Sequence, residues 1–340
     1  MPARERFVRL PKAELHVHLD GSLRPQTLLD LARAARVDLP AADPGSIRRA
    51  FRVDDARNLE DYLRRFALTV AVLQTPEALE RVAFEMVADA ASDGVCCLEV
   101  RYCPLLSCAN GLTLDEIIAA VGRGLRRGAA LHAVRAAMIC CTLRHLDPSQ
   151  SEAIAEAAIR HRGDGVVGFD LAGGEGTHGA ALHRGAFEIA ERGRLGITVH
   201  AGEAAGPESI AEAIFECRAQ RIGHGTRLVE DPALMAYVRD RAIPIEINLS
   251  SNLQTRVVLR ADRHPLRRFL DEGLTVTLSS DNWLMSDVTL SSEYALAAES
   301  LDLTPAEIAT LVLNGFRSAF LPRPIREDLV REAALRLDVA

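Results

Sequence analysis

Four of the ten histidines in this sequence, and one aspartate, occur at or near the ends of short apolar segments: His16, His18, His200, His224 and Asp281. His16 and His18 are two residues apart, so on a β-strand their side chains would point to the same side. Imidazoles combined with one carboxylate form a ligand set that suits Zn²⁺. Because this set contains no thiolate and leaves a position for water, it favours a catalytic zinc site.

The histidine pair has a simpler interpretation when it is taken alone. An isolated H-x-H is more often a pair of hydrogen-bonded polar side chains at a barrel mouth than a metal site. The matching positions of His200 and Asp281, at the ends of two other apolar segments, make the metal site the favoured interpretation.

Two further residues could move protons beside such an ion. Glu203 follows His200 by three residues, in the motif HAGE, and would lie in the loop just above the metal. The alternative for Glu203 is a solvated residue at a helix N-terminus. His224 lies between two glycines in RIGHG, and its spacing is compatible with a ligand, a base or an ordinary core histidine.

Eight apolar segments, several of them rich in β-branched residues, must position these side chains. They are residues 13–19, 95–102, 132–141, 166–173, 196–202, 221–225, 243–251 and 275–281. Several are too apolar for a sheet with one solvated face, which is typical of parallel strands buried on both faces. Because all strand ends of a parallel barrel meet on one face, the five side chains would converge there.

Amphipathic stretches separate these segments, and one of them begins at Pro25, a typical first residue of a helix. The stretches are 25–35, 76–94, 114–129, 151–161, 179–193, 207–217, 232–241 and 264–273. This alternation predicts a (β/α)₈ TIM barrel of the α/β class, with a doubly wound open sheet as the alternative. Residues 20–94 are too long for one crossover, so we expect a helical lid insertion after strand 1, including a helix over 58–73.

Composition limits the classes of protein that remain. The 340 residues, 48% of them hydrophobic, predict a single barrel domain over 1–340 with a large core. A net charge of −7 with scattered arginines argues against nucleic-acid binding. The sequence has seven cysteines but no C-x-x-C pair, which disfavours a thiolate zinc site. It shows no secretory signal and no apolar run of about 18 residues. These features predict a cytoplasmic protein that does not bind membranes. No feature of the sequence indicates an oligomeric state.

Five motifs in order resemble those of the adenosine deaminase family, within the amidohydrolase-like barrels. They are PKAELHVHLDGS (11–22), LEVRYCP (98–104), FDLAGGE (169–175), HAGE (200–203) with RIGHG (221–225), and SSDN ending at Asn282. Each motif alone is weak, but their order at the ends of successive predicted strands is specific. The resemblance covers about residues 11–320.

The resemblance implies hydrolytic deamination of the 6-amino group of an adenine nucleoside, with one Zn²⁺ per chain. It implies that zinc is bound by His16, His18, His200 and Asp281. It also implies Glu203 as the proton donor to purine N1, and His224 as the residue that orients and deprotonates the zinc water. The implied substrate contacts are Gly173 through its backbone N–H to N3, Asp20 to a ribose hydroxyl, and the gate residues Leu59, Tyr62 and Phe66.

The sequence departs from the family pattern at one site position. Asn282 stands where the best-known members have a second aspartate, which faces purine N7. An asparagine amide can donate directly to N7, as it does to adenine in DNA recognition. The change therefore preserves purine binding in principle while leaving the fine specificity open.

Several alternatives remain at this stage. Aminodeoxyfutalosine, N6-methyl-AMP or free adenine could be the substrate of the same chemistry, although Asp20 favours a nucleoside over the free base. A binuclear hydrolase built on a carboxylated lysine is disfavoured, because the only lysine, Lys12, precedes the first strand. A catalytically inactive barrel that serves as a binding module is the remote alternative, since every implied catalytic residue is present.

Overall fold

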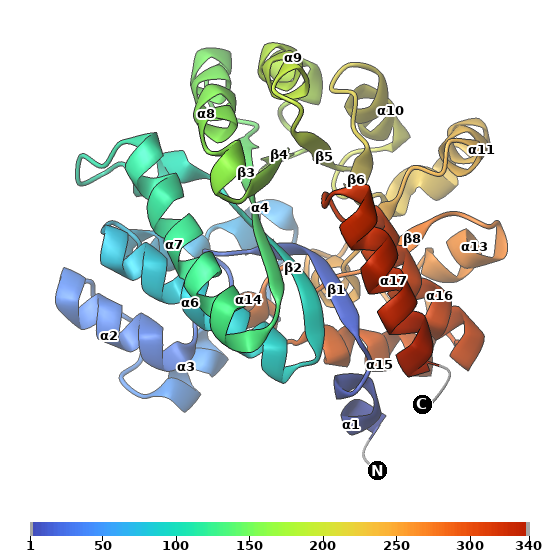
Figure 1. Ribbon diagram of the computed structural model, residues 1–340, viewed down its shortest axis with the longest axis horizontal. Coiled ribbons are helices and arrows are strands. Elements are labelled where there is room, and N and C mark those ends of the chain that lie inside the picture. The colour runs from blue at the N-terminus through green and yellow to red at the C-terminus, as the bar shows by residue number, and fades with distance from the viewer. Residues whose placement is uncertain (1–2, 338–340) are drawn as a thin grey trace.

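The predicted barrel of eight parallel strands is confirmed by the computed structural model, which describes residues 3–337. The strands are β1 (Lys12–His18), β2 (Val95–Tyr102), β3 (Arg135–Leu143), β4 (Val166–Ala172), β5 (Gly196–Ala201), β6 (Arg221–His224), β7 (Ile245–Ile247) and β8 (Val276–Leu278). They pair in chain order, and helices surround them on the outside (Figure 1). All strand ends therefore open on one face, as the site prediction requires.

The ring closes through the backbone of Asp281, just after β8. The His18 N–H donates to the Asp281 carbonyl at 2.8 Å, and the Asp281 N–H donates to the His16 carbonyl at 2.9 Å. These two bonds make a parallel bridge opposite Val17. The contact that closes the barrel thus brings the carboxylate of Asp281 beside both histidines of the H-x-H pair.

Seventeen α-helices lie along the described residues. They are α1 (Ala3–Val8), α2 (Pro25–Ala35), α3 (Pro44–Phe51), α4 (Leu59–Leu63), α5 (Phe66–Val72), α6 (Pro76–Ser92), α7 (Leu114–His132), α8 (Pro148–Arg160), α9 (Arg184–Arg192), α10 (Pro207–Phe215), α11 (Pro232–Asp240), α12 (Leu249–Gln254), α13 (Leu266–Asp271), α14 (Trp283–Ser286), α15 (Leu290–Ser300), α16 (Pro305–Ser318) and α17 (Arg323–Leu337). None of these helices has the length and apolarity that crossing a membrane requires.

Local sequence fixes where α6 begins and ends. The Thr75 side chain accepts a bond from the Ala78 N–H, and Pro76 supplies the first helical residue. The helix stops before Gly94, which has φ of +79°. A Cβ at Gly94 would lie 2.1 Å from the Val8 carbonyl oxygen, so only glycine allows the chain to enter β2 here.

The predicted insertion between the first two strands is present, and α2, α3, α4, α5 and α6 lie within it. The single helix expected over 58–73 is wrong, because the structure has two short helices, α4 and α5. The Arg65 N–H bonds to the Tyr62 carbonyl, three residues back, at 3.3 Å. This tighter turn interrupts the regular α-helical hydrogen bonding and changes the direction of the chain.

The seventh strand is much shorter than the expected 243–251, and the eighth ends before 281. β7 ends at Ile247, and the bond from the Asn252 N–H to the Asn248 carbonyl, 2.9 Å, already belongs to a helical turn. Leu249 is completely buried although it begins α12. The apolar run in the sequence therefore extends past the end of β7, because the helix that follows, α12, is also buried.

Lys12, the only lysine, is buried at the end of the barrel opposite the site, at the start of β1. Its Nζ donates to the carbonyl oxygens of Phe7 at 2.6 Å and Leu10 at 3.0 Å. Burial lowers the pKa of Lys12 to about 8. The ammonium group thus holds the end of α1 and the residues that follow it against the barrel, although burial of its charge is unfavourable.

This burial predicts that stability rises with pH above about 8. As pH increases from 8 towards 10.5, the folded chain loses the Lys12 proton while the unfolded chain keeps it. The unfolded state then binds more protons, so the free energy of unfolding increases, by up to roughly 3 kcal/mol. Urea unfolding at several pH values should show this rise in the wild type and not in Lys12→Met. Parallel pH curves for the two proteins would contradict the prediction.

Candidate active site

A cavity of about 350 Å³ lies at the C-terminal ends of the strands, at the small end of the range for ligand pockets. Every residue that the sequence singled out for the site lines it except His16, which is fully buried. These lining residues are His18, Asp20, Leu59, Tyr62, Phe66, Gly173, His200, Glu203, His224, Asp281 and Asn282. The structure thus brings together side chains that are up to 264 positions apart, from His18 to Asn282.

A larger cavity of about 820 Å³ lies elsewhere, between α1, α2, α6 and the segment around α14. Its wall includes the ion pair between Arg24 and Asp89, 2.7 Å apart. Its described lining contains none of the candidate ligand histidines, so the smaller cavity is the candidate active site.

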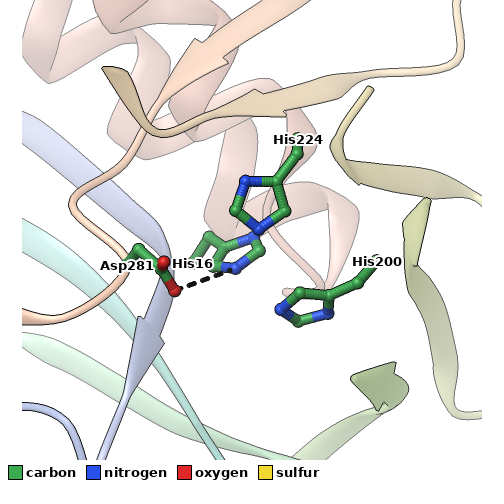
Figure 2. A group of neighbouring side chains, drawn as sticks. All are labelled: His16, His200, His224 and Asp281. Atoms are coloured by element: carbon green, nitrogen blue, oxygen red, sulfur yellow. Dashed lines mark ion pairs between the residues drawn. The ribbon is translucent and has the colours of Figure 1, made fainter. Parts of the chain in front are cut away.

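The candidate ligand atoms lie at short and similar separations. The Nε2 atom of His18 is 3.2 Å from Nε2 of His200 and 3.4 Å from Oδ1 of Asp281, and Nε2 of His16 is 3.5 Å from the same oxygen. Figure 2 shows His16, His200, His224 and Asp281 converging on one space. One ligand atom of each of these four lies within 4.8 Å of all the others.

Carboxylates behind two of the histidines fix which nitrogen faces that space. Nδ1 of His16 contacts Glu246 at 2.8 Å, and Nδ1 of His200 contacts Asp170 at 3.1 Å. Each ring therefore directs Nε2 inward, in the arrangement that metal-ligating histidines share. Arg101 contacts both carboxylates, at 3.0 Å from Asp170 and 2.9 Å from Glu246, and holds the pair in place.

These observations fit a tetrahedral metal ion. Ligand atoms 2.0–2.1 Å from one tetrahedral ion are about 3.3 Å from each other, close to the three separations just given, which connect His16, His18, His200 and Asp281. Nε2 of His16 is buried without a hydrogen-bond partner in the described chain. Burial lowers the pKa of both His18 and His200, which favours the neutral imidazoles that metal ligands need. At His16 burial acts in the same direction, but contacts with Asp281 and Glu246 outweigh it and raise the pKa.

The buried charges around this space also favour a divalent cation. The guanidinium groups of Arg101 and Arg221 pair with the buried carboxylates of Glu99, Asp170 and Glu246, whereas the Asp281 carboxylate contacts only His16 and His18 among the ion pairs of the described residues. Burial would raise the pKa of Asp281, but the close contact with His16 and the other nearby imidazoles lower it well below its usual value. An ionised Asp281 beside the imidazole nitrogens of His16 and His18 is a buried arrangement that a divalent ion would stabilise.

Glu203 has the environment of a buried acid. Its Oε1 atom has no partner in the described chain, and Oε2 lies 3.6 Å from Nε2 of His224. Burial, followed by the charges of Asp281 and Glu175, raises the pKa of Glu203 well above its usual value. This environment favours the protonated carboxyl group, which can act as a proton donor.

Glu175 holds the loop that carries Glu203. Its carboxylate accepts bonds from four successive backbone N–H groups, those of residues 202–205, at 2.6 to 3.0 Å. The HAGE loop thereby wraps around an anion, which also contributes to the raised pKa of Glu203. The position of Glu203 and its raised pKa thus both depend on the buried residue Glu175.

The backbone is strained at two of the site residues. His224 and Asp281 have φ of +64° and +61°, in the left-handed region that non-glycine residues rarely adopt. The two bonds to β1 hold Asp281 in this conformation, and β6 holds His224. Strain of this kind persists where the surrounding structure imposes it, and it is concentrated at functional sites.

The other side of the cavity has the groups expected to contact a purine nucleoside. Burial, with the charge of Asp281, raises the pKa of Asp20 to about 7. The Asn282 amide nitrogen donates to the Tyr62 hydroxyl at 3.0 Å, which connects the end of the barrel to the gate helix α4. Phe66 packs beside Tyr62 with ring centroids 5.9 Å apart. These aromatic rings lie over the polar floor of the cavity.

Sequence reasoning missed the buried residues that support the site, namely Arg101, Asp170, Glu175 and Glu246. Asp170 and Glu246 are charged residues inside otherwise apolar buried strands. Such a residue needs a partner, because an unpaired buried charge is costly. A charged residue within an otherwise apolar strand was therefore the feature of the sequence that could have identified these supporting residues.

Comparisons with known proteins point to one family. The family model described as adenosine deaminase matches residues 11–334. A probable adenosine deaminase from Dictyostelium discoideum is 39% identical over 95% of this chain, which spans 42% of that protein's length. The adenosine deaminase of Mycobacterium ulcerans is 40% identical, with 98% of this chain and 96% of the relative covered.

Solved structures of similar proteins have the same fold. An amidohydrolase from Burkholderia ambifaria with bound zinc is 25% identical, with a TM-score of 0.90 over 100% of this chain and 94% of that one. The N6-mAMP deaminase of Arabidopsis is 27% identical, with a TM-score of 0.86 over 99% of this chain and 100% of that one.

Proposed function

This chain belongs to the adenosine deaminase family, and we propose that it is a zinc-dependent enzyme that hydrolyses the 6-amino group of an adenine nucleoside. Water and adenosine or 2′-deoxyadenosine would give inosine or 2′-deoxyinosine and ammonia. The observation that carries this proposal is the convergence at the floor of one cavity of four candidate ligand side chains, with three contacts of 3.2 to 3.5 Å among them, beside the buried acid Glu203.

The metal would be held by His16, His18, His200 and Asp281. When bound, zinc supplies a hydroxide nucleophile at neutral pH by lowering the pKa of water to about 7. The zinc-bound state of the Burkholderia ambifaria relative supports this choice of ion. The carboxylates behind His16 and His200 would keep both rings in the ligating orientation.

Glu203 would supply the proton that activates the ring. Carbon 6 of adenine is a poor electrophile, and a proton donated to N1 withdraws electron density from it. A carboxyl group whose pKa is raised by burial carries that proton at neutral pH. His224, 3.6 Å from Glu203, would contact the oxygen that adds to carbon 6.

The remaining lining residues would hold the nucleoside. Asp20 would bind a ribose hydroxyl, the Gly173 N–H would bind N3, and Asn282 would donate to N7. Tyr62 and Phe66 would cover the base and exclude water. We propose that the segment 20–94 acts as a lid on a single barrel domain, because α4 and α5 border the cavity.

The wall of the cavity favours a substrate without a phosphate. Arg64 is the one lysine or arginine among the described lining residues, and its side chain is 76% exposed and 3.4 Å from Asp61. A phosphate group would therefore find no buried cation there. The apolar residues Leu63, Val70 and Leu106 would accept an uncharged or bulky apolar 5′ substituent, which keeps aminodeoxyfutalosine as the second candidate.

The test is a substrate panel with the zinc-loaded protein. Loss of the ultraviolet absorbance of the 6-aminopurine would be followed with adenosine, 2′-deoxyadenosine, aminodeoxyfutalosine, AMP, N6-methyl-AMP and adenine. We expect the highest kcat/KM for adenosine or 2′-deoxyadenosine. A preference for aminodeoxyfutalosine would select the second candidate, and no turnover of any member would refute the proposed function.

Asn282→Ala should weaken binding of the transition state by about 1–3 kcal/mol, because the amide that donates to N7 is lost. The corresponding decrease in kcat/KM is about 5- to 150-fold. Tyr62→Phe is the matched control, since it removes the hydroxyl that Asn282 contacts and leaves the amide. If Tyr62→Phe and Asn282→Ala lower kcat/KM equally, the amide acts through the gate helix and not through the purine.

A further inference from the structure

A chain of three buried hydrogen bonds lies behind His224, on the side away from Glu203. The Asn252 Nδ2 atom, on α12, lies 3.0 Å from Nδ1 of His224. The Asn252 Oδ1 atom lies 3.2 Å from Nε2 of His264, which precedes α13. The backbone N–H of Leu266 donates to Nδ1 of His264 at 3.1 Å. The side chains of His224, Asn252 and His264 are almost completely buried.

The backbone end of this chain fixes the direction of every bond in it. A backbone N–H can only donate, so Nδ1 of His264 accepts, and a neutral His264 must have its proton on Nε2. Burial lowers the pKa of His264 to about 3, so the ring is neutral. Nε2 then donates to Oδ1 of Asn252, and the Asn252 amide nitrogen donates to Nδ1 of His224.

We propose that Asn252 and His264 are positioning residues that hold His224 as the tautomer with its proton on Nε2. The ring then presents an N–H donor to the cavity, 3.6 Å from Oε2 of Glu203. The amide nitrogen of Asn248, 3.4 Å from Nδ1 of His224, acts in the same direction. This inference rests on the proposed function and specifies what His224 contributes to it.

The opposite tautomer would disrupt the whole chain. A proton on Nδ1 of His224 would face the Asn252 amide nitrogen, so that amide would have to rotate and offer its nitrogen to His264. His264 would then need its proton on Nδ1, facing the backbone N–H of Leu266. The result is two buried donors directed at each other, an arrangement that leaves both unpaired.

The fixed tautomer changes the role of His224. The family resemblance implies that His224 deprotonates the nucleophilic water, which requires a lone pair directed into the cavity. A ring with Nε2–H instead donates a hydrogen bond to the oxygen that adds to carbon 6, and so stabilises negative charge as it develops there. His224 therefore orients and stabilises this oxygen, and the proton of the nucleophilic water would pass to solvent and not to His224.

Two substitutions of His264, which lies outside the cavity, test this chain of hydrogen bonds. His264→Gln keeps an amide donor for Oδ1 of Asn252, whereas His264→Leu keeps only bulk. We expect His264→Leu to lower kcat of the zinc-loaded enzyme about 10- to 100-fold with KM changed less than about threefold. His264→Gln should stay within about threefold of the wild type in both constants.

The second measurement reads the tautomer directly. Nitrogen NMR of the zinc-loaded protein labelled in histidine distinguishes a protonated ring nitrogen from an unprotonated one, with signals assigned from single-histidine variants. We expect the proton of both His224 and His264 on Nε2 in the wild type. Asn252→Leu should produce a mixture of tautomers at His224, and Asn314→Leu, which removes a buried amide bonded to the Val276 carbonyl, should not.

The outcomes separate the inference from the proposed function. A His224 proton on Nδ1 in the wild type would overturn the inference whether or not the enzyme is active. Equal kcat values for His264→Gln and His264→Leu, both folded and zinc-loaded, would overturn the positioning role. A wild type that deaminates no substrate would refute the proposed function, and the NMR result would still decide the tautomer.

Discussion

Replacing Glu203 with glutamine is expected to lower kcat about 10²- to 10⁴-fold, the usual contribution of a general acid, while the chain keeps its zinc. Glutamine matches the shape of the protonated carboxyl group but has no acidic proton for N1. None of the metal-ligating atoms belongs to Glu203, so metal content should stay at about one zinc per chain. Kinetics and elemental analysis of the same preparation would measure both quantities.

The pH dependence gives a second readout of the same residue. Because burial raises the pKa of Glu203, wild-type kcat/KM should be highest while the carboxyl group is protonated and should fall on the alkaline side. Glu203→Gln should lack this fall. Glu208→Gln, on the exposed surface of α10, is the matched control and should stay within about twofold of wild type. Full activity in Glu203→Gln would rule out its role as the proton donor.

His200→Ala and Asp281→Ala should each abolish turnover together with metal binding. Each substitution removes one of four ligands, and Asp281→Ala also removes one of the buried negative charges that a divalent ion would balance. We expect zinc content to fall from about one per chain to nearly none. Chelation of the wild type should lower its melting temperature, because the like charges of the cluster are then uncompensated.

A histidine at the edge of the cavity supplies the control for this loss. His145 lines the cavity but is exposed and lies outside the metal-binding cluster, so His145→Ala should retain its zinc. Stoichiometric zinc in His200→Ala would contradict the ligand assignment. A chain that unfolds on substitution would be recognised by its circular dichroism, and Asp281→Asn then provides a milder test.

The sequence predicted the barrel because its strands are buried on both faces and therefore appear as continuous apolar runs. That same property concealed where strands end, since Leu249 is as buried in α12 as Ile247 is in β7. The break between α4 and α5 was also hidden, because the helical periodicity of residues 58–73 continues through the turn at Arg65. In both cases burial determines the apolar pattern of the sequence, whereas local hydrogen bonds determine where each helix or strand ends.

For the site, position at strand ends was sufficient to predict that His16, His18, His200 and Asp281 converge. The spacing of two between the first pair and the topology of a parallel barrel carry that information. Distances, and the carboxylates that turn each ring, depend on pairings between strands far apart in the chain. Such pairings leave little trace in the spacing of residues, so Glu246 behind His16 could be recognised only after the fold was known.

The backbone bonds between Asp281 and β1 have a consequence for the way this protein matures. A nascent chain acquires His16, His18 and His200 long before the last strand leaves the ribosome, but the fourth ligand arrives with the residue that closes the ring. With His16, His18, His200 and Asp281 as the proposed ligands, the ligand set would be complete only when the barrel closes. Chains that end between His200 and Asp281 would hold the three imidazoles without a closed barrel, so a tightly held ion would mark only chains that extend past Asp281.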